Sequence, residues 1–223
     1  MTSVHRITRY GFINAYLIED ADGLTVVDTG VGGGAAAILR AAQRLGRPIV
    51  RIVLTHGHGD HVGSLDQLAA QLPQVAVLIS ERDAPLLERD RSARPGEPED
   101  ARMRGSLPGT RTRPTGFLRD GDRVGALEVV ASPGHTPGHC SLLDTRDRTL
   151  YCGDAYTTIG GVATTARGPF WFPLASRATW HAPTALASAR RLRALEPTQL
   201  AAGHGRVVEA PADAMDRAIA RGA

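Results

Sequence analysis

The segment that most constrains this chain is residues 56–61, whose sequence HGHGDH brings three imidazoles and a carboxylate close together. The apolar run at 49–55 reads as a buried strand, so the cluster lies where a strand ends in a loop. Imidazole and carboxylate ligands suit zinc, iron or manganese. Four candidate ligands exceed what one ion takes from so short a loop, so the motif predicts two metals. The alternative is a polar turn that is rich in histidine by chance, and the constellation disfavours it.

Three further positions repeat this arrangement of a polar side chain beside glycine at the end of a predicted strand. They are His135 after the segment 127–131, Asp154 after 149–152 and His204 after 199–202. Glycine lets the backbone approach a metal closely and adopt a positive φ. Five of the eight histidines thus follow predicted strands. The other three, His5, His139 and His181, are expected in packing, in turns or in the outer support of the site.

The apolar pattern predicts strands and helices that alternate in the first half of the chain, followed by shorter strands. The predicted strands are 4–8, 12–19, 24–28, 49–55, 75–80, 123–124, 127–131, 140–144, 149–152 and 199–202, and the predicted helices are 35–47, 64–72, 183–195 and 211–220. Two long stretches, 91–116 and 155–180, lack periodicity. We expect them to wall a substrate cleft, with Phe170, Trp171 and Phe172 as apolar contacts. Packing would explain these aromatic residues equally well.

Length and composition limit the classes of function. With 223 residues and 42% hydrophobic side chains, the chain predicts a single domain over 1–223. No apolar run is long enough to span a bilayer and the first residues do not resemble a secretory leader, so we expect a cytoplasmic protein without a membrane partner. The net charge is only +3, and the arginines of 82–113 alternate with acidic residues and prolines. No nucleic-acid partner is therefore expected.

All 26 basic residues are arginines, which excludes every mechanism that needs a lysine amine. A P-loop, a Schiff base and a carboxylated lysine are excluded, and the last of these argues against an amidohydrolase barrel. Cys140 and Cys152 are expected as small core residues and not as a disulfide, with a thiolate ligand at Cys152 as the alternative. Residues 30–35 match a dinucleotide fingerprint, but no acidic residue follows at the required spacing. We interpret that segment as a strand-to-helix turn.

Taken together, the segment 56–61 and the residues His135, Asp154 and His204 resemble, in order and spacing, the metal-binding signature of the metallo-β-lactamase superfamily. Segments 14–18 and 26–30 are similar to the opening strands of that family, and the resemblance covers essentially the whole chain. It implies an α/β (α+β) fold, a four-layer αββα sandwich of two mixed β-sheets flanked by helices. It also implies a dinuclear site along one edge of the packed sheets.

The resemblance implies a role for each residue of the motif. The first metal would be held by His56, His58 and His135. The second would be held by Asp60, His61 and His204, with Asp154 bridging both. Asp28 would be an outer carboxylate that orients the cluster. The implied cofactors are two divalent metal ions, with Zn²⁺ as the expected species and iron or manganese as alternatives.

The implied reaction is the hydrolysis of a carboxylic ester, thioester or lactone in a small-molecule substrate by a metal-bridged hydroxide. Asp60 would be the catalytic residue that orients the attacking water or accepts its proton. No covalent nucleophile is required, and the chain lacks a G-x-S-x-G elbow. The alternatives are a mononuclear-iron sulfur dioxygenase of the same fold, a β-lactam hydrolase and a non-catalytic metal-binding protein. We expect a monomer or a homodimer, and we expect the glycines within 56–61 to leave this loop bare toward the substrate.

Overall fold

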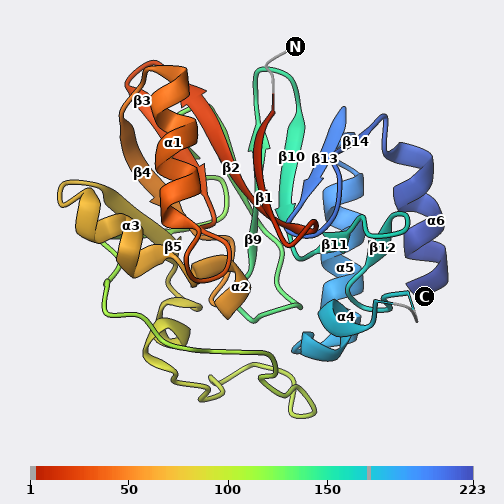
Figure 1. Ribbon diagram of the computed structural model, residues 1–223. Coiled ribbons are helices and arrows are strands. Elements are labelled where there is room, and N and C mark those ends of the chain that lie inside the picture. The colour runs from red at the N-terminus through yellow and green to blue at the C-terminus, as the bar shows by residue number, and fades with distance from the viewer. Residues whose placement is uncertain (1–3, 170–171, 223) are drawn as a thin grey trace.

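The computed structural model describes residues 4–169 and 172–222, which contain two six-stranded sheets and a short two-stranded ribbon (Figure 1). The first sheet consists, in spatial order, of β1 (His5–Arg9), β2 (Ile13–Asp20), β3 (Gly23–Val27), β4 (Ile49–Val53), β5 (Ala76–Ser80) and β6 (Gly116–Leu118). Pairing is antiparallel from β1 to β3 and parallel from β3 to β6. The first sheet is therefore mixed.

The second sheet is mixed as well. It consists, in spatial order, of β14 (Val208–Glu209), β13 (Gln199–Ala202), β10 (Thr149–Gly153), β9 (Cys140–Asp144), β8 (Leu127–Ala131) and β7 (Arg123–Val124). Only β10 and β13 are parallel neighbours among the strands described in this sheet. The separate ribbon pairs β11 (Tyr156–Thr157) with β12 (Ala163–Thr164).

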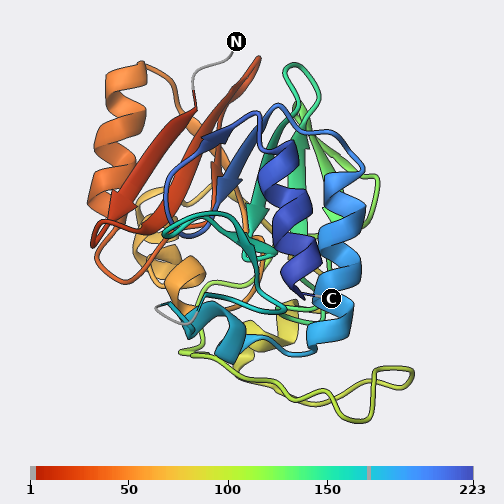
Figure 2. The same ribbon diagram turned by 90° about the vertical axis from the view of Figure 1, so that its right-hand side faces the viewer.

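Helices cover the outer faces of both sheets. The helices α1 (Ala35–Leu45) and α3 (Leu65–Gln71) lie on the first sheet, and α5 (Ala182–Arg193) and α6 (Ala212–Gly222) lie on the second (Figures 1 and 2). Shorter helical segments are α2 (Gly59–Val62), the 3₁₀ helix η1 (Ala84–Glu88) and α4 (Leu174–Ala178). The predicted four-layer αββα sandwich is thus confirmed.

Strand β2 shows why both faces of a sheet must be covered. Its side chains alternate in direction, so Ala15 and Leu17 join the core under α1 and α3. Tyr16 and Ile18 face the other way and join the core between the two sheets. An apolar residue at every position of a strand is typical of a sheet that is buried on both faces. The same alternation in β10 and β13 fills a third core under α5 and α6.

The sequence located the long helices and strands, but it missed most of the short ones, with β7 as an exception. The stretch 155–180 contains β11, β12 and α4, and the stretch 91–116 ends in β6, so neither is wholly irregular. The helix predicted at 183–195 is present as α5, and the one predicted at 211–220 is present as α6. Within the described ranges, no helix has both the length and the apolar character needed to cross a membrane.

Asp20 joins the two sheets at the end of β2. Its carboxylate is buried and accepts hydrogen bonds from the Thr25 hydroxyl at 3.0 Å and from the backbone N–H of Ala126 at 2.9 Å. Ala126 lies between β7 and β8, so this second bond crosses from one sheet to the other. The preceding residue, Gly125, has no room for a side chain, because a Cβ there would lie 2.3 Å from Asp20 Oδ2.

Replacing Asp20 with alanine should lower the free energy of unfolding by about 1–3 kcal/mol, because the Ala126 N–H loses its acceptor at a buried position. Asp22→Ala is the matched control. Asp22 is an exposed carboxylate two residues away whose partner is Arg51, and such surface pairs contribute little. Urea unfolding followed by circular dichroism compares the two variants. Equal destabilisation would contradict the role of Asp20 as a link between the sheets.

Candidate metal centre

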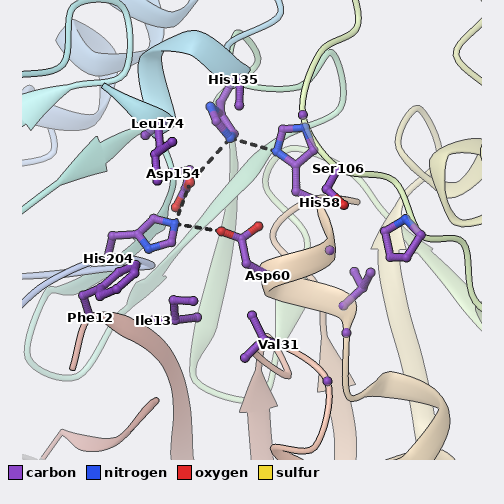
Figure 3. Close-up of a pocket in the computed structure, with 18 of the residues that line it drawn as sticks. Phe12, Ile13, Val31, His58, Asp60, Ser106, His135, Asp154, Leu174 and His204 are labelled. Carbon is purple, nitrogen blue, oxygen red and sulfur yellow. Dashed lines mark hydrogen bonds and ion pairs between the residues drawn. The ribbon is translucent and has the colours of Figure 1, made fainter. Parts of the chain in front are cut away.

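The seven predicted ligands lie together at one edge of the two packed sheets. Figure 3 shows five of them, His58, Asp60, His135, Asp154 and His204, around the cavity. The ligands of 56–61 follow β4 and continue into α2. Asp154 and His204 follow β10 and β13, which run parallel and therefore end at the same edge of the second sheet. His135 lies in the turn between β8 and β9. Each sheet thus supplies part of the cluster.

The donor atoms form three overlapping groups, and within each group they lie within 4.8 Å of one another. The groups are His56, His58 and His135, then His56, His61 and Asp154, then Asp60, His61 and His204. Asp154 Oδ2 is 3.4 Å from His135 Nε2 and 3.2 Å from His204 Nε2. Asp154 therefore lies between the first and the third group, where the resemblance implied a bridging carboxylate.

Two histidines direct unprotonated ring nitrogens at each other. His58 Nε2 lies 2.9 Å from the Arg104 carbonyl oxygen, which can only accept, so Nε2 carries the proton and Nδ1 the lone pair. The Thr179 hydroxyl donates to a backbone carbonyl, so it accepts from His135 Nδ1 and leaves the lone pair on His135 Nε2. His58 Nδ1 and His135 Nε2 are only 2.9 Å apart. Two facing lone pairs repel, and a cation bound by both nitrogens removes that repulsion.

Other buried atoms of the cluster lack hydrogen-bond partners. Within the described residues these atoms include His56 Nε2 and His204 Nδ1, whereas His61 Nε2 and Asp154 Oδ1 face each other as an ion pair at 3.2 Å. An unsatisfied buried polar group costs about 1–3 kcal/mol, so a protein rarely keeps several of them together without a ligand. Five imidazoles and two carboxylates form a donor set that suits zinc, iron or manganese. The residues present therefore fit a pair of metal ions.

The first group consists of neutral imidazoles. Burial lowers the pKa of His58, and it lowers the pKa values of His56 and His135 well below the ordinary histidine value. A neutral imidazole offers a lone pair to a metal, whereas an imidazolium does not. These three side chains thus have the protonation state that metal binding requires.

In the second group, carboxylates determine the charge state of the histidines. Burial opposes the charge of His61 and His204, but the neighbouring carboxylates together outweigh it. Asp154 and Asp28 raise the pKa of His61 well above its ordinary value, and Asp154 and Asp60 raise that of His204 to about 9. Burial likewise opposes the charge of Asp60, but its hydrogen bond to His204 and the nearby His61 lower the Asp60 pKa well below the ordinary value. The two imidazolium protons compensate buried negative charge. A divalent cation can replace them in that role.

Asp28 orients two of the histidines. Its Oδ2 accepts a hydrogen bond from His61 Nδ1 at 2.7 Å, which leaves His61 Nε2 free to face the cluster. The same oxygen accepts from the Thr55 hydroxyl at 2.8 Å, so Thr55 Oγ1 in turn accepts from His56 Nδ1 at 3.0 Å. His56 Nε2 is then the unprotonated nitrogen. Asp28 thus has the contacts that the resemblance implied for an outer carboxylate.

A cavity of about 800 Å³ opens in front of the cluster, and beyond the cluster itself most of the side chains that line it are apolar. Both long stretches contribute to its walls, through residues of 105–110 and of 172–178. Asp60 reaches the cavity, with 36% of its side chain exposed. Phe172 lines it and meets Phe12 edge to face at 5.6 Å between ring centroids. Phe170 and Trp171, which the sequence also assigned to the cleft, lie outside the described residues.

Comparisons with known proteins agree with this geometry. The family model of the metallo-β-lactamase superfamily matches residues 8–204. The chain belongs to this superfamily. It is 42% identical over 208 residues to the uncharacterized protein YobT of Bacillus subtilis (strain 168), covering 93% of this chain and 89% of YobT. It is 33% identical over 157 residues to the hydroxyacylglutathione hydrolase of Gloeobacter violaceus, which matches 68% of this chain but only 52% of that protein.

Solved structures share the fold of this superfamily member. TTHA1623 in a di-iron-bound form has a TM-score of 0.66 and 26% identity, covering 93% of this chain and 94% of that chain. BLEG-1 B3 metallo-β-lactamase has a TM-score of 0.70 at 23% identity, covering 96% of this chain and 97% of that chain. The second likeness shows the fold alone.

Two buried residues support the cluster in ways that the sequence did not specify. Asp83 accepts hydrogen bonds from the Gly57 and Gly138 N–H groups at 3.2 and 2.7 Å, so it ties the loop 56–61 to the turn that carries His135. In the sequence, the feature that could have indicated this role is the position of Asp83 shortly after β5. His139 Nε2 accepts from the Asp154 N–H at 3.0 Å, and burial lowers its pKa to about 3, so it is a neutral acceptor. Outer support was one of the roles expected for His139.

Neither cysteine contributes to the cluster. Cys140 and Cys152 are buried and unbridged, as predicted for small core residues. The Cys152 side chain packs in the core under α5 and α6. Burial raises its pKa well above the ordinary thiol value, so the group stays a neutral thiol. The alternative of a thiolate ligand at Cys152 has no support.

The segment 104–106 forms a strap across the loop 56–61. The Arg104 carbonyl accepts the His58 Nε2 proton, and the Ser106 carbonyl accepts from the Gly59 N–H at 2.9 Å. Gly105 lies so close that a Cβ there would be 2.4 Å from His58 Nε2. Part of the stretch 91–116 therefore orients a predicted ligand, in addition to lining the cavity.

Replacing Gly105 with alanine should weaken zinc binding by about 10–100-fold, because the added methyl group would displace the His58 ring. The dissociation constant is measured by competition with a chromophoric chelator. Gly96→Ala is the matched control, because Gly96 lies in the same stretch with φ +86° against +80° for Gly105, and a Cβ there meets no atom within 4 Å. Backbone strain is then similar in both variants. Equal loss of zinc affinity in both would rule out the steric contact with His58 as the cause.

Proposed function

We propose that this chain is a dinuclear metal-dependent hydrolase that cleaves a carboxylic ester, thioester or lactone bond in a small molecule. The observation that carries the proposal is the pair of facing lone pairs on His58 and His135, within a larger donor cluster that opens to a cavity. One ion would be held by His56, His58 and His135, and the other by Asp60, His61 and His204, with Asp154 between them. Zinc is the expected metal, with iron or manganese as alternatives. The di-iron-bound form of TTHA1623 supports a two-metal site.

Bound divalent cations lower the pKa of water to about 7 and polarise a carbonyl group. The side chains must hold the water and direct its proton. Asp60 suits this role, because its Oδ2 lies 3.2 Å from His204 Nε2 while its Oδ1 has no hydrogen-bond partner among the described residues. Its lowered pKa keeps the carboxylate ionised at neutral pH, so Oδ1 can accept a hydrogen bond from the attacking water and orient it.

The cavity favours a substrate with an apolar acyl or ring portion. Apart from the cluster itself, its charged lining residues in the described part of the chain are Asp66 and Arg177. The Asp66 carboxylate already accepts hydrogen bonds from the N–H groups of Arg111 and Thr112. Similarity to hydroxyacylglutathione hydrolases supports an acyl substrate. The bond cleaved is an ester, thioester or lactone in this proposal.

Protein purified without chelators should contain two metal ions per chain and hydrolyse a generic lactone or thioester. Elemental analysis and a chromogenic hydrolysis assay test both statements. One iron per chain with oxygen consumption would instead identify a sulfur dioxygenase. Hydrolysis of β-lactams alone would identify a β-lactamase, and the absence of metal and activity would identify a binding protein or an inactive one.

Asp60→Ala should lower kcat by about 10²–10⁴-fold, because the variant loses the group that orients the attacking water and one ligand of the second ion. His58→Ala should also abolish hydrolysis by removing a ligand of the first ion. Elemental analysis should show a loss of bound metal in both variants. Asp213→Ala, at an exposed carboxylate on α6, is the control and should retain activity. Wild-type turnover by Asp60→Ala would exclude the assigned role.

Phe172→Ala should raise KM about tenfold for an ester with a long apolar acyl chain and leave kcat largely unchanged, because the lost contact is apolar and lies in the cavity wall. Phe117→Ala is the matched control, since Phe117 lies on β6 with 54% of its surface exposed and does not line the cavity. Steady-state kinetics on acyl chains of increasing length make the comparison. A KM that is unchanged at every chain length would show that Phe172 only packs against Phe12.

A further inference from the structure

A second cavity, of about 730 Å³, lies between the ribbon β11–β12, strand β14 and helix α6. These elements lie together beside α5 in Figure 1. None of the predicted metal ligands lines this cavity. Four arginines do, namely Arg167, Arg206, Arg217 and Arg221, and no acidic residue among those described joins them.

The positive charge in this cavity is not neutralised. The side chains of Arg206 and Arg217 have no hydrogen bond or ion pair within the described part of the chain. Arg167 and Arg221 donate only to backbone carbonyls, at 3.2 Å and 2.7 Å, which position a guanidinium but carry no net charge. The whole chain has a net charge of only +3, so four positive charges in one cavity exceed the excess of the entire molecule.

The nearest acidic residues along α6 do not compensate these arginines. Asp216 forms its ion pair with Arg193 of α5, at 2.9 Å. Asp213 lies one helical turn before Arg217 but forms no ion pair with it and does not line the cavity. A site with four guanidinium groups and no carboxylate attracts an anion of high charge density.

The remaining walls indicate that the anion has an organic portion. Val162, Ala163, Val208 and Ala214 line the cavity between the arginines. Its volume falls within the range of about 300–1,000 Å³ that is typical of small-molecule sites. Guanidinium groups match the oxygen pairs of a phosphate. We propose that this cavity binds a small organic phosphate, with Arg206 and Arg217 as its principal contacts.

The proposed site shares one turn with the metal cluster. The Thr158 hydroxyl lies 3.0 Å from the carbonyl oxygen of His204 and 2.6 Å from that of Arg206. A phosphate can also bind directly to metal ions, so a test must separate the two positions. Variants of the arginine cavity and of the metal cluster do this, because each changes one position and leaves the other intact.

The test is isothermal titration calorimetry of the purified, metal-loaded chain with AMP, phenyl phosphate, inorganic phosphate and adenosine. AMP or phenyl phosphate should bind, and adenosine should not. The double variant Arg206→Ala/Arg217→Ala should weaken binding at least about tenfold for each arginine removed. Arg190→Ala, at an exposed arginine on α5, and Asp60→Ala, in the metal cluster, should both bind as the wild type does. Thermal unfolding confirms that each variant is folded.

Three results would overturn the proposal. The first is the absence of binding for both AMP and phenyl phosphate. The second is binding that survives in the double arginine variant and is lost in Asp60→Ala, because the phosphate then occupies the metal cluster. The third is equal affinity for inorganic phosphate and for the organic phosphates, because the apolar walls then contribute nothing.

Discussion

The structure of the site depends on holding two buried imidazole lone pairs, those of His58 and His135, 2.9 Å apart. Without a cation this contact is repulsive, so each ring has to be fixed from its far side. The Arg104 carbonyl fixes His58, and the Thr179 hydroxyl fixes His135. Asp28 does the same for His61. Folding thus pre-organises the donors, and a bound metal would in turn stabilise the folded state.

The two sheets have to keep their relative position, because neither sheet carries a complete set of donors. Besides Asp20, β2 supplies a second connection. Asn14 Nδ2 donates to the carbonyls of Ala202 and Gly205 at 2.9 and 2.7 Å, on either side of His204, and the Tyr16 hydroxyl donates to Ala202 at 2.6 Å. A strand of the first sheet thereby fixes a donor of the second. Local disruption of these contacts should therefore affect metal binding before it affects any of the three cores.

The clustering of the candidate donors was predictable because each lies next to the end of a strand, and the pattern of 56–61 repeats at His135, Asp154 and His204. The residues that support these donors were less predictable. Asp83 is 26 residues from Gly57 and 55 from Gly138, so no local pattern links them. The strap acts through the carbonyls of Arg104 and Ser106, and every residue type carries a carbonyl. Gly59 lines the cavity as expected, but Gly57 does not: a Cβ there would lie 2.7 Å from Leu86 Cβ, so glycine is needed for the packing of η1.

The candidate metal ligands and much of the cavity wall come from different segments of the chain, and this separation affects substrate specificity. Residues of 172–178 line the cavity but contribute none of the seven predicted ligands, and the segment 104–106 contacts the loop 56–61 through its backbone. Side chains in these segments can therefore change while the carbonyl that orients His58 stays in place, with Gly105 as the exception. Substrate preference can diverge in this way without loss of metal affinity. A shared metal cluster consequently predicts a shared type of reaction, whereas the substrate has to be inferred from the side chains of the two wall segments.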